Sequence, residues 1–165
     1  MRIMGHPVHP ILVPFPIGLL TTSVIFDIAY MITGGRWAVI SFWMIAAGVI
    51  GGLLATVFGL IDWRAIPSGT RAKSVGLLHA STNSLMVALF AISWLLRLEA
   101  PGEPGAVAIV LSFAGVSLIS FGGYLGGELV FRMGVGVSEG ANFAVRGSLS
   151  GRLADEGTAR GRRVE

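Results

Sequence analysis

Four long apolar stretches constrain this sequence more than any other feature. They cover about residues 11–33, 38–61, 75–97 and 106–131, and each is long enough to cross a hydrocarbon core of about 30 Å, which takes roughly 20 helical residues. The chain is 53% hydrophobic and 13% charged, which is too apolar for a soluble domain. The sequence therefore predicts an all-α protein, an integral membrane four-helix bundle whose main partner is the lipid bilayer.

The connections between the stretches indicate how the helices pair. Glycine and proline interrupt the helical pattern at residues 34–36 and 101–105, and short breaks of this kind join antiparallel neighbours. We therefore expect two antiparallel helical hairpins. The first stretch is long and has no small-residue cleavage site behind it, so we interpret it as a retained helix and not as a signal peptide.

Positive charge is distributed unevenly over the ends of the stretches. Of the twelve lysine and arginine residues, Arg36 and Arg97 lie at one end, and the other ten lie at the opposite end or in the C-terminal tail. Because positively charged segments stay in the cytoplasm, we expect a membrane protein with both termini cytoplasmic. This asymmetry accounts for the net charge of +3 without a nucleic-acid partner. We assign residues 1–137 to the membrane domain and 138–165 to a disordered cytoplasmic tail.

Glycines inside the second and fourth stretches indicate helix packing. Gly48 and Gly52, and likewise Gly123 and Gly127, have the G-x-x-x-G spacing that lets helix backbones approach closely in a membrane. We predict that both pairs form packing faces.

A weak internal repeat relates the two hairpins. Each hairpin begins with a histidine, His9 or His79, and ends with an acid, Asp62 or Glu128, on the cytoplasmic side. The repeat predicts a pseudo-two-fold axis along the membrane normal.

A proline-rich segment precedes and opens the first stretch. Residues 5–16 read GHPVHPILVPFP and contain His6 and His9. Pro14 and Pro16 remove backbone donors from a helix, so we expect an irregular or kinked start. Backbone groups freed at this depth must be satisfied by protein or by a wet cavity, and we expect the segment to face the bundle interior.

The predicted topology brings three histidines and two carboxylates to one membrane depth. His79 and Asn83 are four residues apart and share a helix face. Imidazole suits zinc, copper, iron and nickel, and a carboxylate completes the ligand set or orients a ligand. The candidate cofactor-binding residues are His6, His9, His79 and Asn83, and the candidate metal ligands are His6, His9, His79, Asp62 and Glu128.

Each of these residues also has a plain structural interpretation. His6 and His9 can lie near lipid headgroups, Asp62 can be a helix-end acid, and Glu128 can pair with Arg132 at i, i+4. Asp27 lies deeper, and for it a proton relay, a cation site and a hydrogen bond to a neighbouring serine or threonine remain alternatives.

Five motifs of this sequence occur together in a known family. They are residues 6–10 (HPVHP), 15–16 (FP), 59–63 (GLIDW), His79 with Asn83, and residues 122–127 (GGYLGG). Over about residues 5–137 the chain resembles the bacterial domain of unknown function 2231 family. The resemblance implies a four-helix protein of the bacterial inner membrane, and the Rieske-like or cytochrome-like fusions of some relatives imply a membrane redox or haem-binding or metal-binding module.

The leading hypothesis is a non-enzymatic membrane module that binds haem b or a transition metal near its cytoplasmic face, with redox or other membrane proteins as partners. The alternatives are a small ion, proton or metal transporter, which would require a homo-oligomer, and a membrane anchoring or assembly subunit. An enzyme is least favoured, because no activated serine and no phosphate-binding loop is recognisable. The absence of cysteine excludes disulfides, thiolate zinc sites, cysteine-ligated iron–sulfur clusters and covalently attached haem.

Overall fold

The computed structural model describes residues 2–3, 6–138 and 140–144, with side chains from residue 7 onward. Most of the tail assigned to residues 138–165 lies outside the described residues. The elements along the chain are two short strands, five α-helices and one π-helix: β1 Arg2–Ile3, β2 His6–Pro7, α1 Val8–Leu12, α2 Pro14–Thr33, α3 Trp37–Arg64, α4 Arg71–Leu95, α5 Ala106–Gly127 and η1 Glu128–Arg132.

Four helical segments of the described chain are long and apolar enough to cross a membrane. They run over Val8–Thr33, Trp37–Arg64, Arg71–Leu95 and Ala106–Arg132. The all-α, four-helix membrane fold is therefore confirmed. The third segment begins earlier than the apolar pattern indicates, because Thr70 Oγ1 accepts a hydrogen bond from the backbone amide of Lys73 at 3.2 Å and caps the helix.

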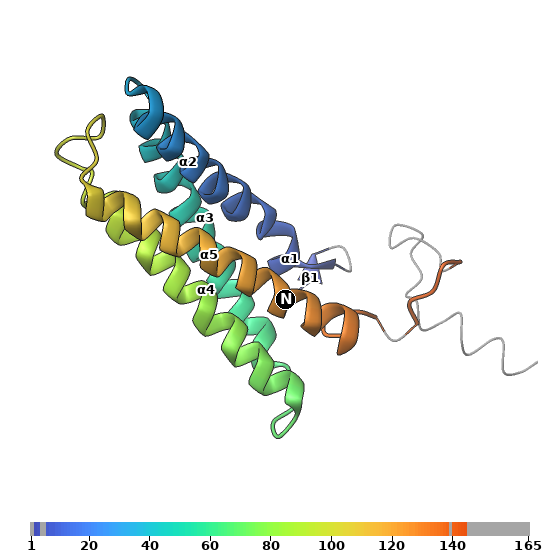
Figure 1. The fold of residues 1–165 in the computed structure, drawn as a ribbon. Helices are drawn as coiled ribbons and strands as arrows, with labels where there is room; N and C mark the ends of the chain where they lie inside the picture. Colours follow the sequence, from blue (N-terminus) through green and yellow to red (C-terminus); the bar gives the residue numbers. More distant parts are fainter. Residues whose placement is uncertain (1, 4–5, 139, 145–165) are drawn as a thin grey trace, which may run out of the picture.

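The four segments form a bundle around one apolar core (Figure 1). Helix α2 packs mainly against α3, α4 packs mainly against α5, and α3 also packs against α4. Leu20, Ile45, Phe90 and Ile119 bring one core residue from each segment. We call the end where α1 begins and α5 finishes the histidine end, and the end with the α2–α3 and α4–α5 connections the Asp27 end.

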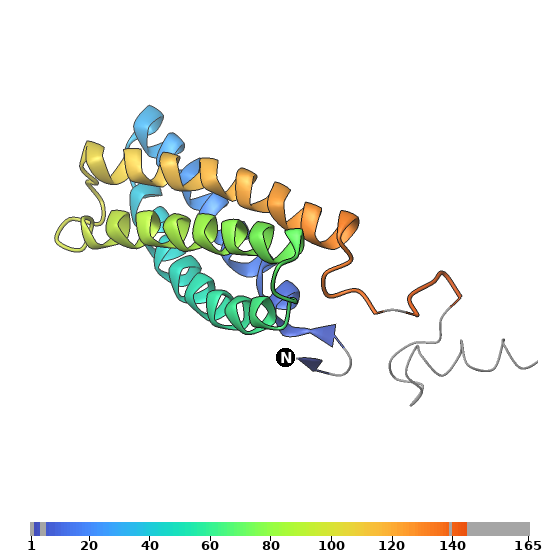
Figure 2. The same cartoon turned by 90° about the horizontal axis from the view of Figure 1, so that it is seen from below.

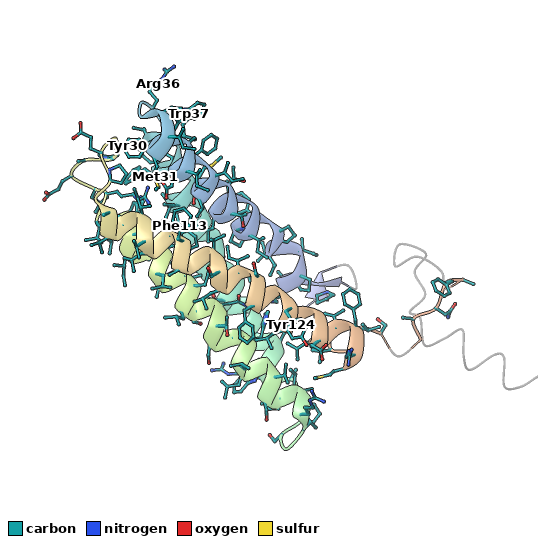
Figure 3. The ribbon with its side chains drawn as sticks, in the orientation of Figure 1. Tyr30, Met31, Arg36, Trp37, Phe113 and Tyr124 are labelled. Carbon is teal, nitrogen blue, oxygen red and sulfur yellow. The ribbon has the colours of Figure 1, made fainter. Side chains whose placement is uncertain are left out.

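The first and fourth membrane segments lie apart at the histidine end. Helix α2 contacts α5, whereas α1 and the last turns of α5 are separated in Figure 2. At the Asp27 end, Tyr30, Arg36 and Trp37 surround the α2–α3 connection (Figure 3). Tyrosine and tryptophan are typical of membrane–water interfaces.

The proline-rich start of the first segment is broken, as its sequence predicts. The helix is interrupted at Val13, between α1 and α2, and Pro14 occupies the first position of α2. The backbone amide of Val13 still donates to the carbonyl of His9 at 3.1 Å, and that of Ile17 donates to the carbonyl of Val13 at 3.3 Å. Val13 itself keeps helical dihedral angles (φ −55°, ψ −39°), so the interruption is slight and His9 stays next to the bundle.

The two predicted glycine faces differ in outcome. A Cβ atom on Gly48 would lie 2.6 Å from Leu20 Cδ2, and one on Gly52 would lie 2.8 Å from Val87 Cγ2, so this pair does pack closely against α2 and α4. The prediction for Gly123 and Gly127 is wrong within this chain, because a Cβ on Gly123 would meet no atom within 4 Å. Spacing alone does not show which side of a helix faces its neighbour.

Trp63 and Lys73 join the end of α3 to the start of α4. The Trp63 indole donates to the Lys73 carbonyl at 3.1 Å, and Lys73 Nζ donates to the Trp63 carbonyl at 2.8 Å. The ammonium also lies 4.0 Å from the centre of the indole ring, a cation–π contact. This reciprocal pairing fixes the α3–α4 connection beside the histidines.

Candidate functional site

Two of the predicted histidines lie together inside the histidine end. His9 comes from α1 and His79 from α4, and their ring centroids are 6.3 Å apart with nearly perpendicular planes at 88°. Both side chains are half-buried. Residues 70 positions apart in the sequence thus form one pair, and each belongs to a different half of the bundle.

Each imidazole donates a hydrogen bond to a helix backbone. His9 Nδ1 lies 2.8 Å from the carbonyl oxygen of Ala55 in α3, and His79 Nδ1 lies 3.0 Å from the carbonyl oxygen of Gly122 in α5. A carbonyl oxygen can only accept, so Nδ1 carries the proton in both rings. In a neutral imidazole this leaves a lone pair on Nε2.

Glycine makes room for both rings in the same way. A Cβ on Gly59 would lie 3.0 Å from His9 Cε1, and a Cβ on Gly126 would lie 3.2 Å from His79 Cε1. Each glycine stands four residues after the residue whose carbonyl accepts the hydrogen bond, since Gly59 follows Ala55 and Gly126 follows Gly122. A helical carbonyl points toward residue i+4, so a missing side chain there exposes the oxygen to the imidazole.

The two histidines are therefore bound by matching structures, one in each half of the chain. The repeat predicted from His9 and His79 extends to the carbonyl and the glycine that receive each ring. The sequence alone pointed to the histidines and the acids, whereas the carbonyl groups carry no residue signature and could not be found. The glycines could have been found from their place just before these acids, because Gly59 lies three residues before Asp62 and Gly126 lies two residues before Glu128.

Asn83 forms a hydrogen bond with the second ring nitrogen of His79, Nε2. Its Nδ2 lies 3.0 Å from His79 Nε2, one helical turn away on α4, and lies further from Nδ1, at 3.4 Å. A bond from an amide N–H requires a lone pair on Nε2, which agrees with the proton on Nδ1. Within the described residues Nε2 of His9 makes no hydrogen bond. Nε2 of His9 is thus open to a ligand, whereas Nε2 of His79 is held by Asn83.

The histidine pair borders a large cavity at this end of the bundle. Its volume is about 910 Å³, within the range of about 300–1,000 Å³ that is typical of small-molecule and cofactor sites. The wall is mostly apolar, and Pro16, Val87 and Ile119 contribute to it. Polar groups gather near His9 and His79, where Asn83, Thr56 and Asp62 also line the cavity.

The other predicted site residues lie apart from this pair or outside what is described. Glu128, in η1, pairs with Arg132 at 3.2 Å, and it is not among the residues that line the cavity. The side chain of His6 lies outside the described part of the chain. Among the described residues, no group of three or more histidine and acidic side chains is placed to hold a metal ion.

A second polar cluster, which the sequence did not reveal as a unit, lies at the Asp27 end. Asp27 and Arg97 are both fully buried, at 0% exposure, and form a two-point ion pair with Nη–Oδ distances of 2.7 and 2.8 Å. Ser41, Ser93 and Ser112 accept the remaining guanidinium hydrogens at 3.3, 3.3 and 3.0 Å. The side chain of Arg97 is thereby bonded to groups on all four membrane segments.

The partner of Asp27 is none of the three alternatives that the sequence offered. Its partner is a buried arginine, and the serines bind the arginine and not the carboxylate. The topology rule treats Arg97 as a loop charge on the outer side, but the chain beyond α4 turns its guanidinium back into the bundle. Two opposite charges on the same side of the membrane were the signal that could have suggested the pair.

Comparisons with known proteins agree with this description. The family model described as "Predicted membrane protein (DUF2231)" matches residues 5–139. No curated protein and no solved structure matches the chain. The matched range includes both histidines with their carbonyls and glycines, Asn83, and the Asp27–Arg97 pair. Because the match extends over most of the chain, the chain belongs to the DUF2231 family of predicted membrane proteins.

Proposed function

We propose that this protein is a non-enzymatic membrane module that binds haem b in the cavity at the histidine end, with His9 and His79 as the two axial ligands. The observation that carries the proposal is the fixed protonation of the two rings. Both Nδ1 atoms donate to backbone carbonyls, an arrangement usual for metal-ligating histidines because it fixes the tautomer and raises ligand basicity. Nε2 of His9 and Nε2 of His79 then each keep one lone pair that a Lewis acid can bind.

The kind of ligand follows from these lone pairs. A quinone presents carbonyl oxygens, which need hydrogen-bond donors, and an unprotonated Nε2 is an acceptor. A bare metal ion such as zinc takes four ligands, and the described residues supply no group of three. Haem brings its own four equatorial nitrogens and needs the protein for axial ligands alone. Two histidines in a largely apolar cavity therefore suit haem better than a free ion or a quinone.

One contact must change for haem to bind. Asn83 Nδ2 holds Nε2 of His79 at 3.0 Å, so its side chain has to rotate away before an iron atom can be ligated there. A neutral hydrogen bond contributes about 0.5–1.5 kcal/mol, which is small beside the stabilisation from an iron–imidazole bond. Asn83 thus protects the tautomer of His79 in the absence of haem and yields its place when haem binds.

The orientation of the bundle belongs to the same proposal. The charge asymmetry favours a cytoplasmic histidine end in a bacterial inner membrane, so the haem would lie near the cytoplasmic face and exchange electrons with a membrane redox partner. The transport hypothesis finds less support. Its outer ion station was Asp27, whose carboxylate is held by Arg97 at 2.7 and 2.8 Å.

Haem titration of detergent-purified protein tests the proposal. Wild-type protein should bind one haem per chain and give a spectrum typical of two histidine ligands. His9→Ala and His79→Ala should each lose that spectrum, while Gly18→Ala, a change at an open helical position outside the cavity lining, should retain it. Equal spectra for wild type, His9→Ala and His79→Ala would refute the assignment of the ligands.

A further inference from the structure

The cavity at the histidine end reaches the protein surface between the first and fourth membrane segments. Pro10 and Pro14, on α1 and α2, both line the cavity and are exposed. Gly123 and Val130, on α5 and η1, do the same from the other side. The two sides of the opening therefore come from α1 and the last turns of α5, which are separated at this end of the bundle (Figure 2).

Gly123 is the position where this opening is least obstructed. A Cβ atom there would meet nothing within 4 Å, whereas one on the adjacent Gly122 would collide with the Asn83 amide. Consecutive residues of α5 thus lie at the surface and at the histidine site. Tyr124, the next residue, is 64% exposed and lies on the outer surface of α5 (Figure 3).

The depth of the opening determines which medium it faces. Pro10 and Pro14 belong to the span Val8–Thr33, and Gly123 and Val130 belong to the span Ala106–Arg132. These four rim residues are uncharged and mostly apolar. An apolar opening between two membrane-spanning segments faces lipid acyl chains and not water.

We propose that this opening is a lateral port to the bilayer, filled by a phospholipid acyl chain in the ligand-free protein, and that the cofactor enters the cavity through it. The inference rests on the proposed function for the identity of the cofactor, whereas the port itself rests on the cavity and its rim. Haem b has an apolar body that dissolves in lipid, so a route from the bilayer lets haem enter without first passing through water.

The lack of native cysteine allows a direct test on ligand-free protein in phosphatidylcholine vesicles. Thr56 lines the cavity from α3, and Thr56→Cys places a single thiol there. A maleimide with a long alkyl chain, dissolved in the bilayer, should label this thiol. Adding Gly123→Trp or Val130→Trp should slow labelling by about tenfold or more, since access limits thiol reactivity.

Gly18→Trp is the matched control for the plugged variants. Gly18 is also an exposed helical glycine whose Cβ would meet nothing within 4 Å, but it does not line the cavity. It should leave the labelling rate unchanged. Equal rates in the Gly123→Trp, Val130→Trp and Gly18→Trp backgrounds would overturn the port, as would faster labelling by a charged, water-soluble methanethiosulfonate than by the alkyl maleimide.

Haem loading separates this inference from the proposed function. If both hold, Gly123→Trp slows the transfer of haem from haem-loaded vesicles but leaves the final spectrum unchanged, and Gly18→Trp slows nothing. A protein that binds no haem but shows port-dependent maleimide labelling would contradict the proposed function and support the port. A protein that loads haem at equal rates in both variants would support the function and contradict the port.

Discussion

At the scale of single residues, the site depends on which nitrogen of each histidine carries the proton. The carbonyls of Ala55 and Gly122 fix that proton on Nδ1. Asn83 then binds the lone pair of His79 at 3.0 Å. His9 has no such partner within the described residues, so the two rings differ in how readily they can accept a ligand.

Replacing Asn83 should strengthen haem binding. In Asn83→Leu, which keeps the branched shape of the side chain, Nε2 of His79 is no longer held by an amide. Removing a competing bond of about 0.5–1.5 kcal/mol should lower the Kd for haem by a factor of about 2 to 10. Equilibrium haem titration in detergent measures the change. A weaker affinity would mean that Asn83 supports the bound state and does not compete with it.

At the scale of helices, glycines make the close contacts between neighbouring helices. The sequence does not show which neighbouring helix each glycine faces. Gly115, Gly122 and Gly126 face α4, where Cβ atoms would meet Phe90, Asn83 and His79. The hydrophobic pattern predicted the four spans, the break among the prolines and the approximate depth of the histidines, because each follows from local composition. It could not give the rotation of α5 about its axis, and so it assigned Gly123 to a packing face.

Replacing Gly59, which makes room for the His9 ring, by a larger residue should displace that ring. A Cβ on Gly59 would lie 3.0 Å from His9 Cε1 and 3.1 Å from Nδ1, so the larger side chain in Gly59→Leu has no room unless the imidazole leaves Ala55. We expect at least about a tenfold loss of haem affinity, with wild-type helicity by circular dichroism. Gly18→Leu, at an open helical position, is the control. Wild-type affinity in Gly59→Leu would show that the His9–Ala55 contact is dispensable.

At the scale of the whole molecule, hydrogen bonds join the four segments at the Asp27 end, and a cavity lies between them at the histidine end. The buried Arg97 guanidinium bonds to Asp27, Ser41, Ser93 and Ser112, one from each membrane segment. The opposite end contains the cavity of about 910 Å³. The sequence placed Asp27 and Arg97 on the same side of the membrane but did not give their contact, because Arg97 lies beyond the last residue of α4 and its side chain reaches back.

Breaking the Asp27–Arg97 pair should destabilise the fold without abolishing cofactor binding. Removing one partner leaves a buried, unpaired charge, at a cost of about 3–5 kcal/mol. Asp27→Leu and Arg97→Leu should each lower Tm strongly, and the double variant should lower it less than either single change does. Thermal unfolding in detergent provides the measurement. An unchanged Tm together with altered ion flux in proteoliposomes would instead favour transport.

The central claim is that His9 and His79 hold haem b. The most direct test is the visible absorption spectrum, with metal analysis, of wild-type protein purified in detergent from cells supplied with iron and a haem precursor. We expect a Soret band, about one haem per chain, and the low-spin spectrum that two imidazole ligands give. Folded protein that is colourless and free of iron would contradict the claim.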